Sequence, residues 1–192
     1  MDHDKPTAVP ESLQYRDGRY ALERFGASLT DWSPRALRIF TRGLRSIHRP
    51  WFAVRMPTGV AELTTTGRKS GQPRSTFVRA YRDGARAYLV AITGEHTLWL
   101  KNIRAHPTVT LRFGRKRFTG VARDPRDAAE LAALRRAFTQ THPFDYPENM
   151  VHRSGFPTRA KIVELHLAWL EGGTPLVVDL DVPSPAAVDK GQ

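Results

Sequence analysis

The strongest constraint on the fold is a series of short strand-like segments joined by hairpin turns in the middle of the chain. The segment 108–113 shows this best, because Val109, Leu111 and Phe113 alternate with polar residues, which is the two-residue period of a strand with one buried face. The other predicted strands are 60–65, 74–81, 86–92, 116–123 and, further along the chain, 160–168. We therefore predict an α+β, mainly β fold built around a small β-barrel.

Turn and cap residues mark the ends of these strands and of the helices between them. Gly84 lies between two strand-like runs and predicts a hairpin turn. The segment 97–106 predicts a short helix that ends before a proline. A second helix is predicted from Pro125 to about Thr141, with Asp124 as its N-cap. Residues 142–157 are predicted to form a loop.

The two ends of the chain differ from this central part, and we divide the 192 residues into three regions. We expect residues 1–50 to form an N-terminal arm and a basic amphipathic helix, 51–182 the barrel domain, and 183–192 a disordered tail. The helix is expected over 33–50, with apolar residues on one face and arginines on the other. That helix could cover the core with its apolar face, or it could make peripheral contact with an anionic membrane surface.

Composition excludes some classes of site and favours others. The chain has no cysteine, which excludes disulfides, thiolate metal sites and thiol nucleophiles. Its seven histidines have no metal-ligand spacing, so no metal site is predicted. The net charge of +11 attracts anions: nucleic acid, acidic lipid headgroups, or a phosphorylated or carboxylated small ligand. No zinc-finger or RNA-recognition signature accompanies the charge, so no specific nucleic acid is expected as a partner.

A turn between the first two predicted strands carries a concentrated positive charge. Gly67 and Gly71 allow the backbone to turn tightly and to approach a ligand. The forked donors of Arg68 and Arg74 suit phosphate or carboxylate, and Lys69 adds a point charge. Hydroxyl groups follow at Thr66, Ser70 and Ser75. This pattern is typical of an anion-binding loop, although a solvated hairpin turn has a similar composition.

The turn and the segments after it resemble the deazaflavin-dependent nitroreductase family. The resemblance covers about residues 60–124 and lies in the order and spacing of several motifs. These are Leu63-Thr64-Thr65-Thr66-Gly67-Arg68-Lys69-Ser70-Gly71-Gln72-Pro73-Arg74, Asp83-Gly84, Tyr88-Leu89-Val90-Ala91, Trp99 with Asn102, and His106-Pro107. It implies a split β-barrel related to proteins that bind flavin mononucleotide (FMN), and a cofactor, the 8-hydroxy-5-deazaflavin coenzyme F-420.

The resemblance also implies which residues contact the cofactor. The turn would hold the phosphate and the carboxylates of its glutamate tail, the next strand would run beside the ring, and the segment 91–102 would complete the pocket. The implied cofactor-binding residues are Arg68, Lys69, Ser70, Arg74, Ser75, Thr76, Phe77, Ala91, Thr93, Gly94, Trp99 and Asn102. Many relatives have a lysine where this chain has 93–96, so one phosphate contact differs.

Substrate contacts are less well defined by the motifs. Characterised relatives have a cluster of tyrosines near the C-terminus, of which this chain keeps Tyr146. Tyr146 and His142 are therefore candidates to donate a proton or to hydrogen-bond a substrate. Each could equally be a loop residue without a role.

The sequence thus predicts an oxidoreductase that transfers a hydride from reduced F-420 to an electron-poor acceptor, namely a quinone, a nitroaromatic or an activated alkene. The alternative is an FMN-binding or non-catalytic protein of the same fold. Because no apolar run approaches the length of a membrane span, we expect a cytoplasmic protein, peripheral at the inner face of the membrane if the 33–50 helix binds lipid. A monomer and a homodimer are both compatible with the sequence.

Overall fold

The structure is a computed structural model that describes residues 21–22, 27–28 and 56–181. The helix expected over 33–50 and the tail expected over 183–192 lie outside the described residues. Two short strands precede the main body, β1 (Ala21–Leu22) and β2 (Ala27–Ser28), and they pair with each other in antiparallel fashion.

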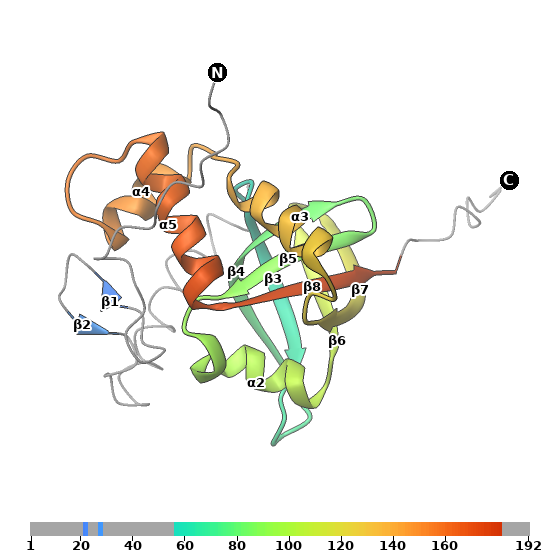
Figure 1. The fold of residues 1–192 in the computed structure, drawn as a ribbon. Coiled ribbons are helices and arrows are strands. Elements are labelled where there is room, and N and C mark those ends of the chain that lie inside the picture. Colours follow the sequence, from blue (N-terminus) through green and yellow to red (C-terminus); the bar gives the residue numbers. More distant parts are fainter. Residues whose placement is uncertain (1–20, 23–26, 29–55, 182–192) are drawn as a thin grey trace, which may run out of the picture.

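Six antiparallel strands close into a barrel (Figure 1). In barrel order they are β3 (Val60–Thr66), β4 (Pro73–Asp83), β5 (Arg86–Ala91), β8 (Thr174–Leu180), β7 (Lys116–Arg123) and β6 (Thr108–Phe113). Each strand therefore has two neighbours in the sheet, although β4 pairs with β5 only over Ala80–Asp83. The prediction of a mainly β fold around a small barrel is confirmed, as is the hairpin turn at Gly84, where φ is +56°.

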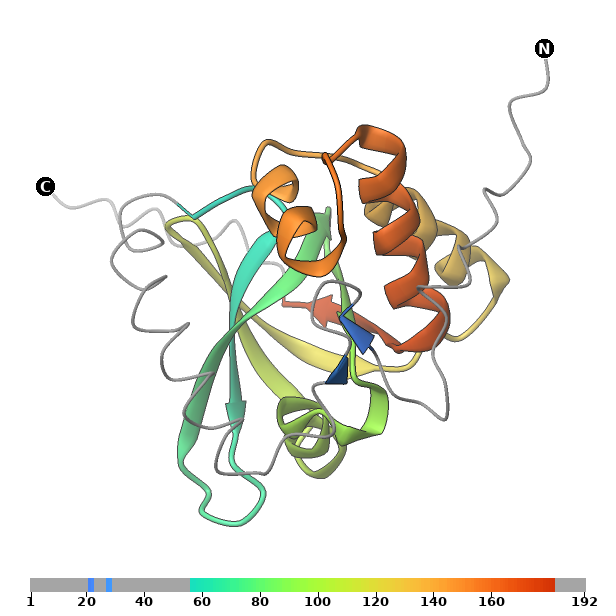
Figure 2. The same ribbon diagram turned by 90° about the vertical axis from the view of Figure 1, so that its left-hand side faces the viewer.

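Four α-helices and one 3-10 helix surround the barrel in the described part of the chain. They are the 3-10 helix η3 (Gly94–His96), α2 (Leu98–Ala105), α3 (Ala128–Phe138), α4 (Asp145–His152) and α5 (Arg159–Gly172). The β3–β4 turn and α2 lie at one end of the barrel and α4 lies near the other end, as both ribbon views show (Figures 1 and 2). No helix among the described residues is long and apolar enough to cross a membrane.

Two apolar cores hold these layers together. The first fills the barrel and includes Leu63, Leu89 and Leu111. The second lies between the outside of the barrel and helices α3 and α5, and it includes Phe138 and Trp169. Side chains of one strand alternate between the inside and the outside of the barrel, so β4 and β5 contribute to both cores.

Three predictions in the C-terminal half are wrong. The segment 160–168 is not a strand but part of α5, whose buried residues surround the helix almost completely, so its apolar pattern has no clear helical period. The expected loop 142–157 contains α4. The N-cap of α3 is Asp127, whose carboxylate accepts a hydrogen bond from the Glu130 N–H at 2.8 Å, whereas Asp124 accepts one from Arg104.

Candidate functional site

The turn between β3 and β4 is held closed by its own backbone. The Gly67 N–H donates to the Gln72 carbonyl at 2.9 Å, and the N–H groups of Ser70 and Gly71 donate to the Gly67 carbonyl at 3.1 and 2.7 Å. A Cβ at Gly67 would lie 2.9 Å from Ser70 Oγ, and Gly71 has a φ of +65°. The positive φ favours glycine at position 71, and the close approach of Ser70 Oγ favours it at position 67.

The side chain of Asn102, on α2, forms hydrogen bonds to both ends of the turn. Its Nδ2 donates to Thr65 Oγ1 at 3.2 Å, and its Oδ1 accepts the Arg68 N–H at 3.2 Å. Thr65 Oγ1 in turn donates to the Arg74 carbonyl at 3.4 Å. Because Asn102 is 9% exposed and bonds to both sides of the turn, it joins α2 to the two strand ends that carry the cations.

The three cations of the turn point into solvent. Arg68, Lys69 and Arg74 are exposed, and none of them forms an ion pair with another described residue. Ser70 is also exposed, and Ser75 is partly buried, with its hydroxyl 2.9 Å from Thr64 Oγ1. The turn therefore presents three positive charges that no described residue compensates, on a backbone that its own hydrogen bonds hold in place.

Beyond the turn, β4 separates the predicted ring contacts between its two faces. Thr76 pairs with Leu63, a barrel-core residue, so Thr76 faces the inside of the barrel. Ser75 and Phe77 are on the outer face, where Phe77 is half-buried. A ligand that extends from the turn along the outside of β4 would meet Ser75 and Phe77 and not Thr76.

The segment 91–102 lies beside the turn, but part of it belongs to the core. Ala91 ends β5 and is fully buried, and Trp99 packs against the barrel core. The hydroxyls of Thr93 and Thr97 are 2.7 Å apart. Gly94 has a φ of +54° at the start of η3, so the backbone there can approach a ligand closely.

Tyr146 and His142, the candidate proton donors, are not adjacent to the turn. Tyr146 is on α4 and is 40% exposed. His142 precedes α4, and its backbone N–H donates a hydrogen bond to Asp145 Oδ2 at 2.6 Å. Its buried Nε2 has no hydrogen-bond partner among the described residues, and its ring centroid is 6.0 Å from that of Tyr81.

A buried charge cluster below α4 was missed by sequence reasoning. Arg79 of β4 forms ion pairs with Asp145, at 2.5 Å, and with Glu148. Possible ligand atoms of Asp145, Glu148 and His166 lie within 4.8 Å of one another, but the Arg79 guanidinium already pairs with both carboxylates. The sequence signal was the pair of acids three residues apart, which is visible only once 145–152 is recognised as a helix.

Burial changes the proton affinity of the aromatic groups around this cluster. The pKa of His166 falls to about 4, mainly because the ring is buried and also because Arg79 is near. Burial likewise lowers the pKa of His152 to about 4 and raises the pKa of Tyr81. The two histidines are therefore neutral at physiological pH.

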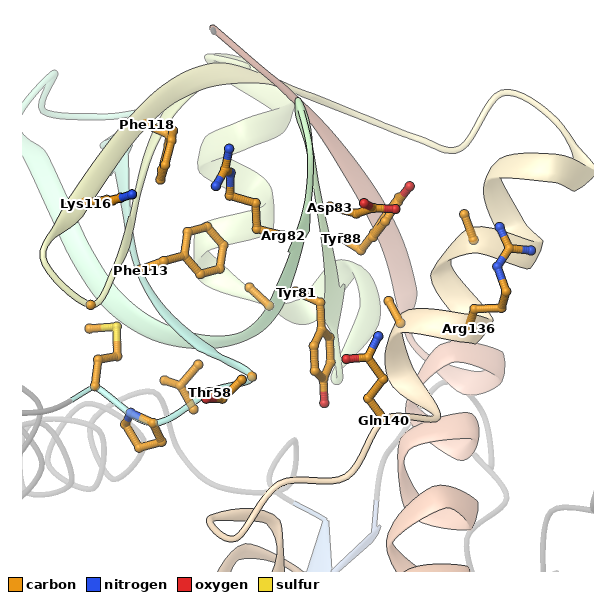
Figure 3. A pocket seen from close by; sticks show the side chains of 18 residues that line it. Thr58, Tyr81, Arg82, Asp83, Tyr88, Phe113, Lys116, Phe118, Arg136 and Gln140 are labelled. Atoms are coloured by element: carbon orange, nitrogen blue, oxygen red, sulfur yellow. The ribbon is translucent and has the colours of Figure 1, made fainter. Parts of the chain in front are cut away.

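A cleft of about 630 Å³ lies at the far end of β4 from the turn (Figure 3). Its walls come from that end of β4, from the β6–β7 hairpin and from α3, and its cations are Arg82, Lys116 and Arg136. The Arg82 guanidinium lies 4.2 Å from the centre of the Phe118 ring. None of the predicted cofactor residues lines this cleft, so the cleft and the family motif lie at opposite ends of the strand.

Solved structures resemble this chain only weakly. An F420-H2 dependent reductase, FDR-A, matches with a TM-score of 0.41 and 20% identity over 62% of this chain and 93% of its own. A heme binding protein from Mycobacterium smegmatis matches with a TM-score of 0.40 and 19% identity over 68% of this chain and 49% of its own. The closed six-stranded barrel described above defines the fold here.

Comparison at the level of sequence is more specific. The F420H(2)-dependent quinone reductase Rv1261c of Mycobacterium tuberculosis (strain ATCC 25618 / H37Rv) is 41% identical over 66 residues, which is 33% of this chain and 44% of that protein. The match thus spans less than half the length of the relative. A family model for F420H(2)-dependent quinone reductase matches residues 38–155, more than half of the chain. The chain therefore belongs to the F420H(2)-dependent quinone reductase family.

Proposed function

We propose that this protein binds reduced coenzyme F-420 through the β3–β4 turn and reduces a quinone or a similar electron-poor acceptor. One observation carries the proposal: Arg68, Lys69 and Arg74 project from a hydrogen-bonded turn and have no carboxylate partner among the described residues. Elsewhere on β-strands of the barrel, arginines such as Arg112 and Arg123 pair with acids.

The donor set of the turn suits the anionic part of such a cofactor. A phosphodiester and glutamate carboxylates require cationic and neutral donors, and the turn offers both, since Ser70 is also exposed. Because Asn102 and the two turn glycines fix the backbone before a ligand arrives, little conformational entropy is lost on binding. Ser75 and Phe77 would then continue the site along the outer face of β4.

The chemistry supplied by the bound deazaflavin is transfer of a hydride to an acceptor. The protein's own contribution is to bind and orient the cofactor, to exclude water from one side of the ring and to supply a proton. Tyr146 is our candidate for that proton, because it is the partly exposed phenol on α4. His142 is less suited, since its ring Nε2 is buried and not exposed to an acceptor.

The test is a fluorescence titration of the purified full-length protein with F-420 and, in parallel, with FMN. We expect F-420 to bind and the substitution Arg74→Ala to weaken binding by roughly 10- to 100-fold, as for a charge-assisted hydrogen bond. Arg159→Ala is the matched control, because Arg159 is an exposed arginine on α5 without an ion pair to any described residue. Tighter binding of FMN than of F-420 would leave the fold assignment unchanged and would identify FMN as the cofactor. Binding of neither compound would contradict the proposal.

Peripheral membrane contact is a separate proposal that depends on the basic segment 33–50, which the structure does not describe. If this segment lies on anionic lipid, the protein should sediment with vesicles that contain an acidic phospholipid and not with neutral vesicles. Equal sedimentation with both types of vesicle, or with neither, would contradict that proposal without affecting the assignment of the cofactor.

A further inference from the structure

Helix α4 is attached to the barrel differently from its neighbours. Its fully buried side chains are Asp145 and Asn149, both polar. Helices α3 and α5 instead bury large apolar side chains such as Phe138 and Trp169. Apart from the ring of His152, which packs edge-on against Trp169 of α5, the contacts that hold α4 in place are therefore largely polar.

Arg79 makes the central polar contact to α4. Its guanidinium pairs with Asp145 at 2.5 Å and with Glu148, one helical turn further on, and the side chains of Arg79 and Asp145 are 2% and 0% exposed. Gly59 leaves the space for it, because a Cβ there would lie 2.7 Å from Arg79 Nη1. A buried charge that loses its partner is strongly destabilised, so loss of Arg79 should drive the two acids, and α4 with them, toward water.

Arg79 lies next to the residues of β4 that are predicted to contact the deazaflavin ring. Arg79 is on the outer face of β4, two residues or about 7 Å beyond Phe77 along the strand. The register agrees, since Phe77 pairs with Glu62 and Arg79 pairs with Val60 on the neighbouring strand. Tyr146 follows Asp145 directly on α4, so the position of Arg79 relative to Phe77 also fixes that of the candidate proton donor.

We propose that Arg79 is a positioning residue that holds α4, and with it Tyr146, on the side of the cofactor site where the electron acceptor binds. The inference rests on the proposed function and deepens it, because it assigns the acceptor side to α4. Arg79 acts through Asp145 and Glu148 and does not itself contact the cofactor or the acceptor. Its loss should therefore affect use of the acceptor and leave binding of the cofactor at the turn intact.

The first experiment measures the position of α4 by amide hydrogen exchange of segment 142–153, with neither cofactor nor acceptor present. Arg79→Met should speed exchange in this segment by about fivefold or more, because local opening becomes less costly, and Arg79→Lys should restore much of the protection. Arg123→Met is the matched control: it removes an ion-paired arginine that holds α3 instead. Unchanged exchange in Arg79→Met, or equal loss of protection in Arg123→Met, would overturn the anchoring role.

The second experiment separates use of the acceptor from binding of the cofactor. With reduced F-420 and a water-soluble 1,4-naphthoquinone, Arg79→Met should raise the acceptor KM or lower kcat by about fivefold or more. The Kd for F-420 should stay within about twofold of the wild-type value, because the turn is untouched. An equal loss of F-420 affinity, or normal acceptor kinetics, would overturn the assignment. If the wild-type protein bound no F-420, the proposed function and the acceptor role would fail together, and exchange alone would decide whether Arg79 anchors α4.

Discussion

The β3–β4 turn and the Arg123 cluster use the same residue type in opposite ways. In the turn, Arg68 and Arg74 are exposed and have no carboxylate partner among the described residues. In the Arg123 cluster, which comprises Arg123, Glu130, Asp179 and the nearby Arg86, the Arg123 guanidinium donates two hydrogen bonds to Asp179, at 2.6 and 3.0 Å, and two to Glu130, both at 2.7 Å.

The difference shows how this basic chain separates stability from binding. Arg123 joins β7 to β8 and to α3, and its hydrogen bonds hold the pKa of Glu130 at about 2 and lower the pKa of Asp179. Its charge is thus compensated within the fold. The cations of the turn are compensated by no described residue, so a bound anion can provide the compensation. Substitutions in the two regions should therefore have separable effects.

The largest effect on stability is expected for Arg123→Met. It removes the four hydrogen bonds that Arg123 donates to Glu130 and Asp179. Glu130, whose side chain is 6% exposed, then keeps only the longer contact with Arg86 at 3.6 Å. The midpoint of thermal unfolding should fall by roughly 6 °C or more for a chain of this length, as measured by circular dichroism. F-420 affinity should not change. A Tm within about one degree of the wild-type value would show that the cluster contributes little.

Salt should distinguish the two regions in the wild-type protein. Raising sodium chloride from about 0.05 M to about 0.5 M should weaken F-420 binding roughly tenfold, because the cations of the turn are exposed and screened. The Tm should change much less, since Arg123 is largely enclosed by its partners. Titrations and melting curves at both salt concentrations check this. Affinity that does not depend on salt would argue against an electrostatic site at the turn.

A smaller effect is expected for Asn102→Ala. The substitution removes the hydrogen bonds to Thr65 Oγ1 and to the Arg68 N–H. The backbone of the turn is then held less firmly, while its three positive charges remain. F-420 affinity should fall by roughly 2- to 10-fold, in keeping with one or two neutral hydrogen bonds. A titration of the variant measures this. A loss as large as that of Arg74→Ala would indicate that Asn102 contacts the ligand itself.

Acidification should destabilise the protein in two separable steps that do not involve the turn. His152 and His166 have pKa values lowered to about 4 from about 6.5, so stability is full above pH 6.5 and declines as the pH falls toward 4, where the unfolded state binds more protons. The lowered pKa of Glu130, about 2 against 4.5, adds a second loss as the pH falls below about 4.5.

Single variants should reduce these steps one at a time. His166→Asn should make the dependence of Tm on pH between about 6.5 and 4 less steep without abolishing it, because His152 still contributes. Arg123→Met should make the dependence less steep below about 4.5. Thermal melts across this pH range measure both slopes. A wild-type Tm that stays constant from pH 6.5 to 4 would show that neither buried histidine is linked to folding.

The strands of the barrel were predictable because their information is local. Alternation in 108–113 and the flanking turns fix β6 and β7 without knowledge of distant residues. The segment 160–168 misled because a helix buried on nearly all sides has no polar face to reveal its period. β8 was missed altogether, although its residues, 174–180, complete the barrel between β5 and β7.

Only part of the candidate site could likewise be predicted from the sequence. The cationic turn was visible in the sequence because its glycines and cations are adjacent. The anchor of α4 was not, because Arg79 and Asp145 are 66 residues apart and meet only after the barrel and the helices have assembled. Thr76 and Ala91 were included among the contacts by motif alone, and only the strand register and burial show that they face or belong to the core.

The most direct test of this account measures F-420 affinity and Tm together for the wild-type protein, Arg74→Ala and Arg123→Met. We predict that Arg74→Ala weakens binding by roughly 10- to 100-fold with little change in Tm. Arg123→Met should lower the Tm by roughly 6 °C or more and bind F-420 with wild-type affinity. If both variants lost affinity and stability in parallel, the account would be contradicted, since it assigns binding to a turn that no described residue compensates and stability to the Arg123 cluster.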